Sequence, residues 1–429
     1  MTVIASDVST SFTWHDQARI VATGGSKPSD PASEVVSCAS SEICLISDAD
    51  PVAAIHQIFH ACKKGREFSV VTKAMAGKKS KARDADTTPC FQCMSSGTTG
   101  QPKSIRRTHL SWIKSFEINA GKFSLTPADS YGVLGHLSHS LALYSVMEAA
   151  HIGADIHVLA QMRPDRQIKA LAAQETSILY ATPTQLRLLF ATENSLGPQT
   201  LPAVRFVFCG GGNLDQTTRE NAAVFFPNAA LHEFYGASET SFISIADVET
   251  PTGSVGKAYP GVSVEIRQEE IALKNGVGEV WVKSPYLFNG YGHGDSEDTV
   301  WRDRFLSVGE MGWIDDRGNL FIAGRKSRMV TIADQNAFPE EAEEFLLSDP
   351  DVPHCCVLPR PDVKRGNVFV AIVAGNENAE TRDRLIKLCR QTLGPLKAPR
   401  KIIFLPDFPL LSSGKPDLSS IRKIVGSML

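Results

Sequence analysis

Residues 95–103 of this chain read SSGTTGQPK and follow the run CFQCM (90–94), which is typical of a β-strand. The two glycines let the backbone come close to a ligand. Four hydroxyls and several free amides can surround phosphate oxygens, and Lys103 can neutralise their charge. Pro102 stands where a Walker A loop needs its second glycine, so the stretch is not that motif. We therefore predict a phosphate-binding loop at the end of a strand.

Strand and helix patterns alternate on both sides of this loop. Before it, a strand at 43–47, a helix that begins at Pro51 with Asp50 as its cap, and a strand at 68–71 are predicted, after a polar opening stretch to about Glu34. After it, the predicted strands are 131–134, 155–159, 177–180, 205–209 and 230–234. Helices are predicted at 141–151, 163–173, 183–190 and 215–225. This alternation favours an α/β fold with a mainly parallel sheet covered by helices.

The pattern changes in the second half of the chain. Short strands at 262–267, 279–283 and 320–322, separated by glycine-rich turns, predict a small β-rich subdomain. Beyond Arg325 the order becomes helix 340–347, strands 355–358 and 368–374, helix 381–392 and strand 401–405. We predict a large N-terminal domain at 1–324 and a small α+β C-terminal domain at 325–429, a normal domain size.

Composition narrows the classes of function. Among 429 residues, 42% are hydrophobic and 21% charged, and the net charge of -3 argues against a nucleic-acid partner. No apolar run approaches the roughly 20 residues of a membrane span, and the opening residues do not resemble a secretory signal. Nine cysteines fit a reducing cytoplasm. Cys90 and Cys93 form a CxxC, which we interpret as strand residues, because redox pairs usually open a helix.

Three further motifs carry chemistry. FYGASET (234–240) follows a predicted strand, and its Glu239 can hold Mg²⁺. VGEMGWIDD (308–316), continued by GRK (324–326), offers Glu310 and Arg325 to a ribose diol. SSGK (412–415) places Lys415 near the C-terminus.

In this order and at these distances, the four motifs resemble the acyl-adenylate-forming superfamily of acyl-CoA synthetases, luciferases and nonribosomal peptide synthetase adenylation domains. The resemblance runs from about Cys90 to the end. Further matches support it: Pro183, 210–212 (GGG), Gly256, 260–261 (PG), 278–279 (GE) and 290–291 (GY).

The resemblance implies a site for ATP and Mg²⁺. Its phosphate-binding residues would be Ser95, Ser96, Gly97, Thr98, Thr99, Gly100 and Lys103. The residues around the adenine, the ribose and the α-phosphate would be Gly210, Gly211, Gly212, Tyr235, Gly236, Ala237, Ser238, Glu310 and Arg325. Glu239 would bind Mg²⁺, and Lys415 would bridge the substrate carboxylate and the α-phosphate.

The implied reaction turns a carboxylic acid into an acyl-adenylate and releases pyrophosphate. A carboxylate must approach a polyanion, so Lys103, Mg²⁺ and Lys415 would screen the like charges and stabilise the transition state. The acyl group would then pass to the thiol of CoA or of a phosphopantetheine on an acyl carrier protein. In the family the small domain swings about a hinge between the two steps.

The sequence says less about the identity of the substrate acid. The resemblance places the acyl pocket at His136, Ser138, His139 and Tyr144, with His139 near the substrate carboxylate; a packing or capping histidine is the other interpretation. The aspartate that binds the α-amino group in amino-acid-activating relatives is missing from this stretch. An uncharged aliphatic or aryl acid is therefore expected.

Several positions depart from the family pattern. Only about 94 residues precede the phosphate loop, which indicates a shortened N-terminal region. Ser238 replaces a threonine, Glu310 replaces an aspartate and adds about 1.5 Å of reach, and Ser327 occupies the hinge position. Ala333 and Asp334 (333–334) replace glycines beside the pantetheine tunnel. Two alternatives stay open: adenylate formation alone or transfer to an amine, and a catalytically silent nucleotide-binding protein.

Overall fold

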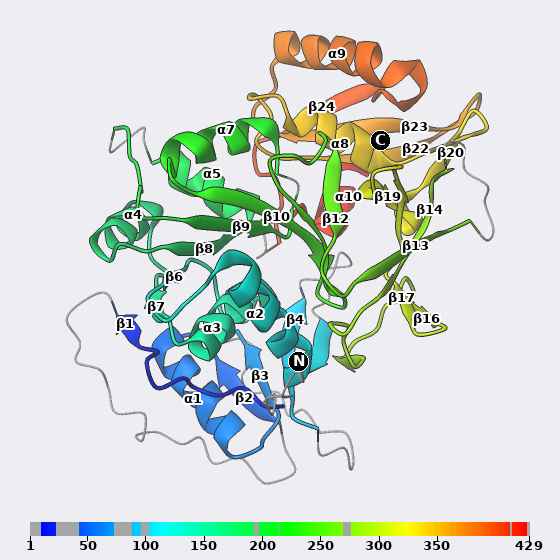
Figure 1. Cartoon of the computed structure of the whole chain (residues 1–429). Helices are drawn as coiled ribbons and strands as arrows, with labels where there is room; N and C mark the ends of the chain where they lie inside the picture. The colour runs from blue at the N-terminus through cyan, green and yellow to red at the C-terminus, as the bar shows by residue number, and fades with distance from the viewer. Residues whose placement is uncertain are drawn as a thin grey trace.

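The computed structural model describes residues 10–22, 43–72, 88–95, 103–192, 197–212, 214–268, 276–411 and 414–426. Its architecture confirms the predicted fold class. A large N-terminal part is built on mixed sheets with helices on their faces, and a small α+β region follows it (Figure 1). The basic, glycine-containing stretch 73–83 of the sequence lies outside the described residues.

The largest sheet joins fourteen strands of the described residues and begins with a parallel half. In spatial order this half contains β1 (Ile20–Ala22), β7 (Asp155–Val158), β6 (Ser130–Val133), β8 (Ile178–Ala181), β9 (Phe206–Gly210) and β10 (Ala230–Ala237). Alternate side chains of these strands point to opposite faces of the sheet, and apolar residues at successive positions make both faces apolar. Ile178 and Tyr180 join one core, whereas Leu179 and Ala181 join another.

Helices cover these two faces. The first core contains side chains of α2 (His109–Phe123) and α3 (Ser140–Ile152). The second contains side chains of α4 (Pro164–Ala173), α5 (Pro183–Phe190) and α7 (Gln216–Phe225). Helix α2 was not predicted from the sequence. Its buried face carries His109, Ser111, Ser115 and Asn119, and these polar residues interrupt the apolar period that marks a helix.

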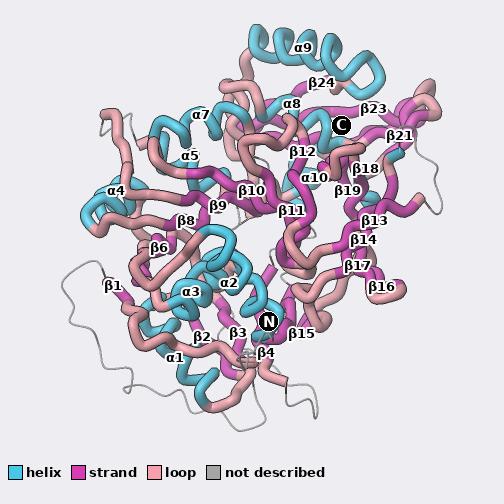
Figure 2. Tube along the Cα trace, in the orientation of Figure 1, coloured by secondary structure: helices cyan, strands magenta, loops and turns pink. Residues whose placement is uncertain are grey.

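The same sheet continues with antiparallel strands. Their members are β11 (Ser241–Ala246), β12 (Ser254–Ala258), β19 (Asn319–Arg325), β18 (Glu310–Ile314), β14 (Gly278–Lys283), β17 (Phe305–Ser307) and β16 (Val300–Arg302), with β13 (Ser263–Arg267) paired to β14. The predicted β-rich segment is therefore antiparallel, and it extends the parallel sheet directly through the β10–β11 pair (Figure 2).

A second sheet of five strands carries the segment that leads into the predicted phosphate loop. Its order is β15 (Tyr291–His293), β5 (Lys103–Thr108), β4 (Cys90–Ser95), β3 (Phe68–Val71) and β2 (Cys44–Ser47). Helix α1 (Pro51–Lys63) begins as predicted, because one Asp50 carboxylate oxygen accepts the amides of Val52 and Ala53, both at 3.0 Å. Cys90 and Cys93 are buried in β4, as expected of strand residues.

The C-terminal region has hydrophobic cores of its own. Its elements are η3 (Lys326–Arg328), β20 (Val330–Ile332), β21 (Gln335–Ala337), α8 (Pro339–Leu347), β22 (Cys355–Asp362), β23 (Gly366–Ala374), α9 (Ala379–Lys397), β24 (Lys401–Leu405) and α10 (Leu418–Val425). All five elements predicted between 340 and 405 are present. Helix α10 was not predicted.

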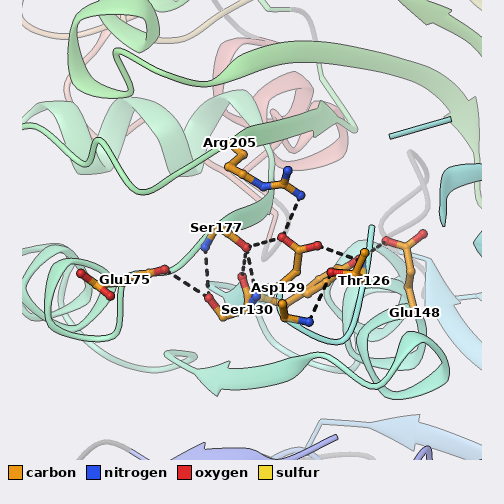
Figure 3. Close-up of polar contacts among 9 residues, drawn as sticks. Thr126, Asp129, Ser130, Glu148, Glu175, Ser177 and Arg205 are labelled. Carbon is orange, nitrogen blue, oxygen red and sulfur yellow. Dashed lines mark hydrogen bonds and ion pairs between the residues drawn. The ribbon is translucent and has the colours of Figure 1, made fainter. Parts of the chain in front are cut away.

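A polar network ties together the amino ends of the parallel strands (Figure 3). Asp129 accepts hydrogen bonds from Arg205 Nη2 and Ser177 Oγ at 2.9 Å, and from the Thr126 amide at 2.9 Å. Ser177 and Ser130 also bond each other through their amides and hydroxyls. These contacts fasten the segments that enter β6, β8 and β9. In open sheets of this kind, ligands bind at the opposite, carboxyl ends of the strands.

Glu148 of α3 is a buried carboxylate without a cation partner in the described parts of the chain. It accepts hydrogen bonds from Asn119 Nδ2 at 2.8 Å, Tyr180 OH at 2.7 Å and Tyr131 OH at 3.1 Å. Burial raises the pKa of Glu148 to about 7, and these hydrogen bonds limit the rise.

The raised pKa predicts a stability change with pH. A shift of the Glu148 pKa from the ordinary 4.5 to about 7 corresponds to about 3 kcal/mol in the free energy of unfolding. Between these two pKa values, the folded protein keeps the Glu148 proton, whereas the unfolded chain has released it. The contribution of this proton to stability is therefore lost as the pH rises through about 7. In urea unfolding at pH 5 and pH 8, we expect Glu148→Gln to reduce the fall in the free energy of unfolding. An equal fall in the variant and the wild type would contradict the prediction.

Candidate active site

The motif 234–240 turns sharply between β10 and β11 at the carboxyl end of the parallel half. A β-bulge interrupts the pairing at Tyr235 and Gly236. A Cβ atom on Gly236 would lie 1.8 Å from the carbonyl oxygen of Ser241, so only glycine fits there. Ser241 itself has a φ of 56°, a left-handed conformation. The tight turn directs the residues that follow Gly236, including Glu239, to the edge of the sheet.

Glu310 and Arg325 form an ion pair across two neighbouring strands. They are directly opposite in the β18–β19 register, and Arg325 Nη2 lies 3.0 Å from Glu310 Oε1. The Tyr235 hydroxyl hydrogen-bonds to Glu310. Burial raises the pKa of Glu310, while Arg325, Lys415 and Tyr235 oppose that rise. The pair predicted to hold the ribose is thus joined to the tyrosine predicted beside the adenine.

Lys415 enters this site from the C-terminal region. Its loop is closed by hydrogen bonds from the Leu411 amide to the Lys415 carbonyl and from the Gly414 amide to the Leu411 carbonyl, both at 2.8 Å. Gly414 has a φ of 79°, and a Cβ atom added there would lie 3.3 Å from Thr184 Cγ2 at the start of α5. Lys415 is exposed to solvent as a whole residue, although protein atoms surround its ammonium group closely enough to desolvate it. Desolvation lowers the pKa of Lys415.

Charged groups from three parts of the chain meet around Lys415. Arg325 lowers its pKa further, while Glu310 and Glu239 raise it. Arg325 in turn interacts with Glu310, Tyr235 and Glu239, and these groups raise its pKa against the effect of burial. Two cations and two carboxylates therefore share one site.

Glu239 and Lys103 lie beside Tyr291 of β15. The Tyr291 hydroxyl donates to Glu239 Oε1 at 2.8 Å, and it also lies 2.8 Å from Thr299 Oγ1. Lys103 Nζ is 5.7 Å from the centre of the Tyr291 ring. Lys103 forms no ion pair among the described residues. From the sequence, Tyr291 was named only as part of a family match. The structure adds its pairing with Ile105 of β5 and its hydrogen bond to Glu239.

The glycine run and the phosphate loop lie at the ends of strands. Gly210 ends β9, and Gly211 has a φ of 84°. A Cβ atom added to Gly211 or Gly212 would contact Thr182 or Pro183, respectively. Ser95 and Lys103 are directly opposite in the β4–β5 register, so both ends of the predicted loop are anchored at one place. Ser96, Gly97, Thr98, Thr99 and Gly100 lie outside the described residues, as does the side chain of Ser95.

The predicted acyl-pocket residues have protein partners. His139 pairs with Met94 in a parallel bridge at the end of β4, and burial lowers its pKa, which favours the neutral imidazole. Ser138 Oγ donates to Asp48 Oδ2 at 2.6 Å, and His136 Nδ1 lies 3.6 Å from the same oxygen. Tyr144 is buried, and its hydroxyl lies 2.8 Å from Ser115 Oγ. Asp48 was missed, because it follows β2, far away in the sequence.

The arrangement is compatible with a nucleotide and a magnesium ion. No cluster of three or more histidine, cysteine or acidic residues that could hold a metal by itself exists in the described parts of the chain. Mg²⁺ is commonly bound by one or two carboxylates together with substrate phosphates and water. Glu239 would be that carboxylate, and Lys103, Lys415 and Arg325 would face the phosphates and the ribose. Within the described ranges, no helix is long and apolar enough to cross a membrane.

Family models match two parts of the chain. The model of the AMP-binding enzyme covers residues 5–292, and the model of the AMP-binding enzyme C-terminal domain covers residues 341–415. An uncharacterised acyl-CoA ligase of Bacillus subtilis strain 168, YhfT, is 32% identical over 340 residues, which are 78% of this chain and 68% of that protein.

Solved structures share the fold. The amide bond synthetase McbA from Marinactinospora thermotolerans superposes with a TM-score of 0.73 at 21% identity, with 89% of each chain covered. The o-succinylbenzoate coenzyme A synthetase MenE from Bacillus subtilis, in complex with ATP and magnesium, gives a TM-score of 0.69 at 20% identity and covers 88% of this chain and 79% of its own.

The fold and the family matches together define an adenylate-forming, acyl-CoA ligase-like enzyme. This chain belongs to the AMP-binding enzyme family, as the four motifs indicated.

Proposed function

We propose that this enzyme uses ATP and Mg²⁺ to convert a carboxylic acid to an acyl-adenylate, releases pyrophosphate, and transfers the acyl group to a thiol. The convergence of Lys415, the Glu310–Arg325 pair and Glu239 at one edge of the sheet carries the proposal. These groups come from distant parts of the sequence, and they match the charges that an acid and a nucleotide present.

Each group has a defined task in this proposal. Glu310 accepts hydrogen bonds from the ribose hydroxyls, and Arg325 holds the Glu310 carboxylate in place. Bound Mg²⁺ neutralises phosphate charge, and Glu239 holds it, oriented by the Tyr291 hydroxyl. The Lys415 ammonium lies between the incoming carboxylate and the α-phosphate, where negative charge builds up in the transition state.

The acid is proposed to be aliphatic or aryl, with no ammonium group. Two buried carboxylates, Asp48 and Glu148, occupy the region of the predicted pocket, but protein donors satisfy both. Neither is left to pair with a substrate ammonium, and an unpaired buried charge is costly.

We also infer that the chain divides near Arg325 into domains 1–324 and 325–429. Separate hydrophobic cores on either side support this division. Next to the boundary, Ser327 Oγ donates to Asp298 Oδ2 at 3.1 Å, and Lys326 Nζ lies 3.2 Å from Glu279 Oε2. These two contacts hold the segment at the proposed hinge against the large domain.

The thiol is proposed to belong to CoA or to the phosphopantetheine of a carrier protein. In the β20–β21 hairpin, Ala333 and Asp334 have φ values of 46° and 62°. The turn therefore keeps the left-handed backbone that glycines would adopt, although Asp334 adds a negative charge. That charge disfavours the phosphates of CoA, so we give the carrier protein slight preference.

ATP–pyrophosphate exchange with a panel of fatty, aryl and amino acids tests the first step. We expect exchange with a fatty or aryl acid and none with the proteinogenic amino acids. The active acid is then offered CoA, a holo carrier protein and simple amines. No exchange with any acid would reject the proposal in favour of a silent nucleotide-binding protein. Exchange without product on either thiol would leave adenylate formation or transfer to an amine.

Glu239→Gln is expected to raise the Mg²⁺ concentration needed for half-maximal exchange. Glutamine keeps an oxygen for the Tyr291 hydroxyl but removes the charge that binds a hard cation. The increase should be at least the roughly 10-fold that is typical for loss of a supporting contact. Exposed Glu249, changed in the same way, is the control. An unaltered Mg²⁺ titration would remove Glu239 from the metal site.

A further inference from the structure

Arg107 of β5 is a fully buried arginine, with 1% of its surface exposed. It forms no ion pair with a carboxylate in the described parts of the chain. Burial lowers its pKa to about 10, while Cys93 and Glu239 oppose the fall, so the guanidinium stays charged at neutral pH. A buried charge is costly, and its hydrogen bonds should therefore show what it stabilises.

The guanidinium group binds two backbone carbonyls, one of which belongs to the 234–240 turn of the candidate site. Nε and Nη2 donate to the Ser238 carbonyl at 3.2 and 2.8 Å, and Nη1 donates to the Tyr286 carbonyl at 2.6 Å. Nη1 also lies 3.4 Å from Ser111 Oγ. The fork of an arginine can make all these bonds at once, whereas a lysine presents a single ammonium group.

The Ser238 carbonyl belongs to the peptide bond that leads into Glu239. On the other side of this residue, the Glu239 carbonyl accepts the Phe288 amide at 2.9 Å, and the carboxylate accepts the Tyr291 hydroxyl at 2.8 Å. Arg107 thus fixes the peptide bond before Glu239, and Phe288 and Tyr291 fix Glu239 itself. β5 and β15 are hydrogen-bonded neighbours, so together they form a platform for Glu239.

We propose that Arg107 is a positioning residue for Glu239, the Mg²⁺ ligand of the proposed function on which this inference rests. It holds the 238–239 peptide in the orientation that directs the Glu239 carboxylate toward the metal. The role differs from that of a core residue, because two of the four contacts of the guanidinium group are with the carbonyl that directly precedes Glu239.

Arg107→Met tests the proposal, and Arg106→Met is the matched control. Arg106 is the next residue of the same strand, and its side chain is 11% exposed, but it pairs with Glu67 at 3.0 Å instead of contacting the turn. Both variants should lower the melting temperature. Only Arg107→Met should speed amide hydrogen exchange in peptides that cover 235–242 of the ligand-free protein. It should also raise the Mg²⁺ requirement of pyrophosphate exchange by about 10–100-fold, as for lost supporting contacts.

Arg107→Lys retains the charge and should recover part of both effects; it also replaces Arg107→Met if that variant does not fold. If Arg107→Met matched Arg106→Met in hydrogen exchange and in Mg²⁺ requirement, the proposal would be overturned while the proposed function stood. If the wild type exchanged pyrophosphate with no acid, the proposed function would fail. The hydrogen-exchange comparison would then still decide whether Arg107 positions Glu239.

Discussion

Replacing Lys415 by alanine is expected to slow ATP–pyrophosphate exchange by about 10²–10³-fold, the usual cost of losing one preorganised transition-state contact. Stability should change little, because the loop is held by backbone bonds at Leu411 and Gly414 and the side chain is in contact with solvent. ATP binding should be nearly retained, since Glu310, Arg325 and Tyr235 remain.

Exchange rates and calorimetric ATP binding of the purified variant measure the two effects separately. Lys423→Ala is the control, because Lys423 is an exposed lysine of the nearby helix α10. Exchange at the wild-type rate in Lys415→Ala would remove Lys415 from the chemistry. Equal loss of rate and of ATP affinity would show that the lysine binds the nucleotide and contributes no further transition-state stabilisation.

Gly236→Ala is expected to lower the free energy of unfolding by at least about 3 kcal/mol. The added Cβ atom would lie 1.8 Å from the Ser241 carbonyl oxygen, a backbone atom that cannot turn aside. The β10–β11 bulge must open, and Glu239, three residues further on, loses its position. We therefore expect little exchange activity in the fraction that remains folded.

Urea unfolding and the specific exchange rate check this expectation. Gly121→Ala is a matched control: Gly121 is an exposed helical residue of α2, and a Cβ atom added there would have no neighbouring side chain or other helix-external atom within 4 Å. That change should stabilise the protein slightly, because alanine favours helix. A Gly236→Ala variant as stable and active as the control would show that the turn can adjust.

The sequence predicted elements best where local signals agreed. Helix α5 and strand β24 begin and end at the expected residues. A capping box of Thr182 and Gln185, with Pro183 at the first position, starts the helix, and a short apolar run defines the strand. Helix α2 was missed because polar residues interrupt the apolar pattern of its buried face. The continuity of the two sheet halves was also missed, since it depends on the β10–β11 bulge and not on any pattern within one element.

For the site, the motifs supplied the residues but not their partners. Glu239, Glu310, Arg325 and Lys415 were named from the sequence, whereas the roles of Tyr291, Asp48 and Arg107 emerged only from strand pairing and packing. Arg107 lies within β5, which was not predicted as a strand, and a lone arginine gives no signal that it binds a carbonyl 131 residues away. Long-range hydrogen bonds of this kind have no local sequence signature.

The two cations of the site lie in different parts of the chain, and this difference has an electrostatic consequence. Arg325 stands at the inferred domain boundary, where it ends β19 and is paired with Glu310 in the large sheet, while Lys415 lies within the C-terminal region. With both carboxylates ionised, Arg325 and Lys415 balance Glu310 and Glu239, two positive charges against two negative ones. Under the proposed hinge motion, Lys415 departs and Arg325 stays, so this group of four is left with an excess negative charge. The site thereby loses one of the positive charges that face the phosphates, so the movement that ends adenylation would also weaken the attraction for pyrophosphate and discourage the reverse reaction.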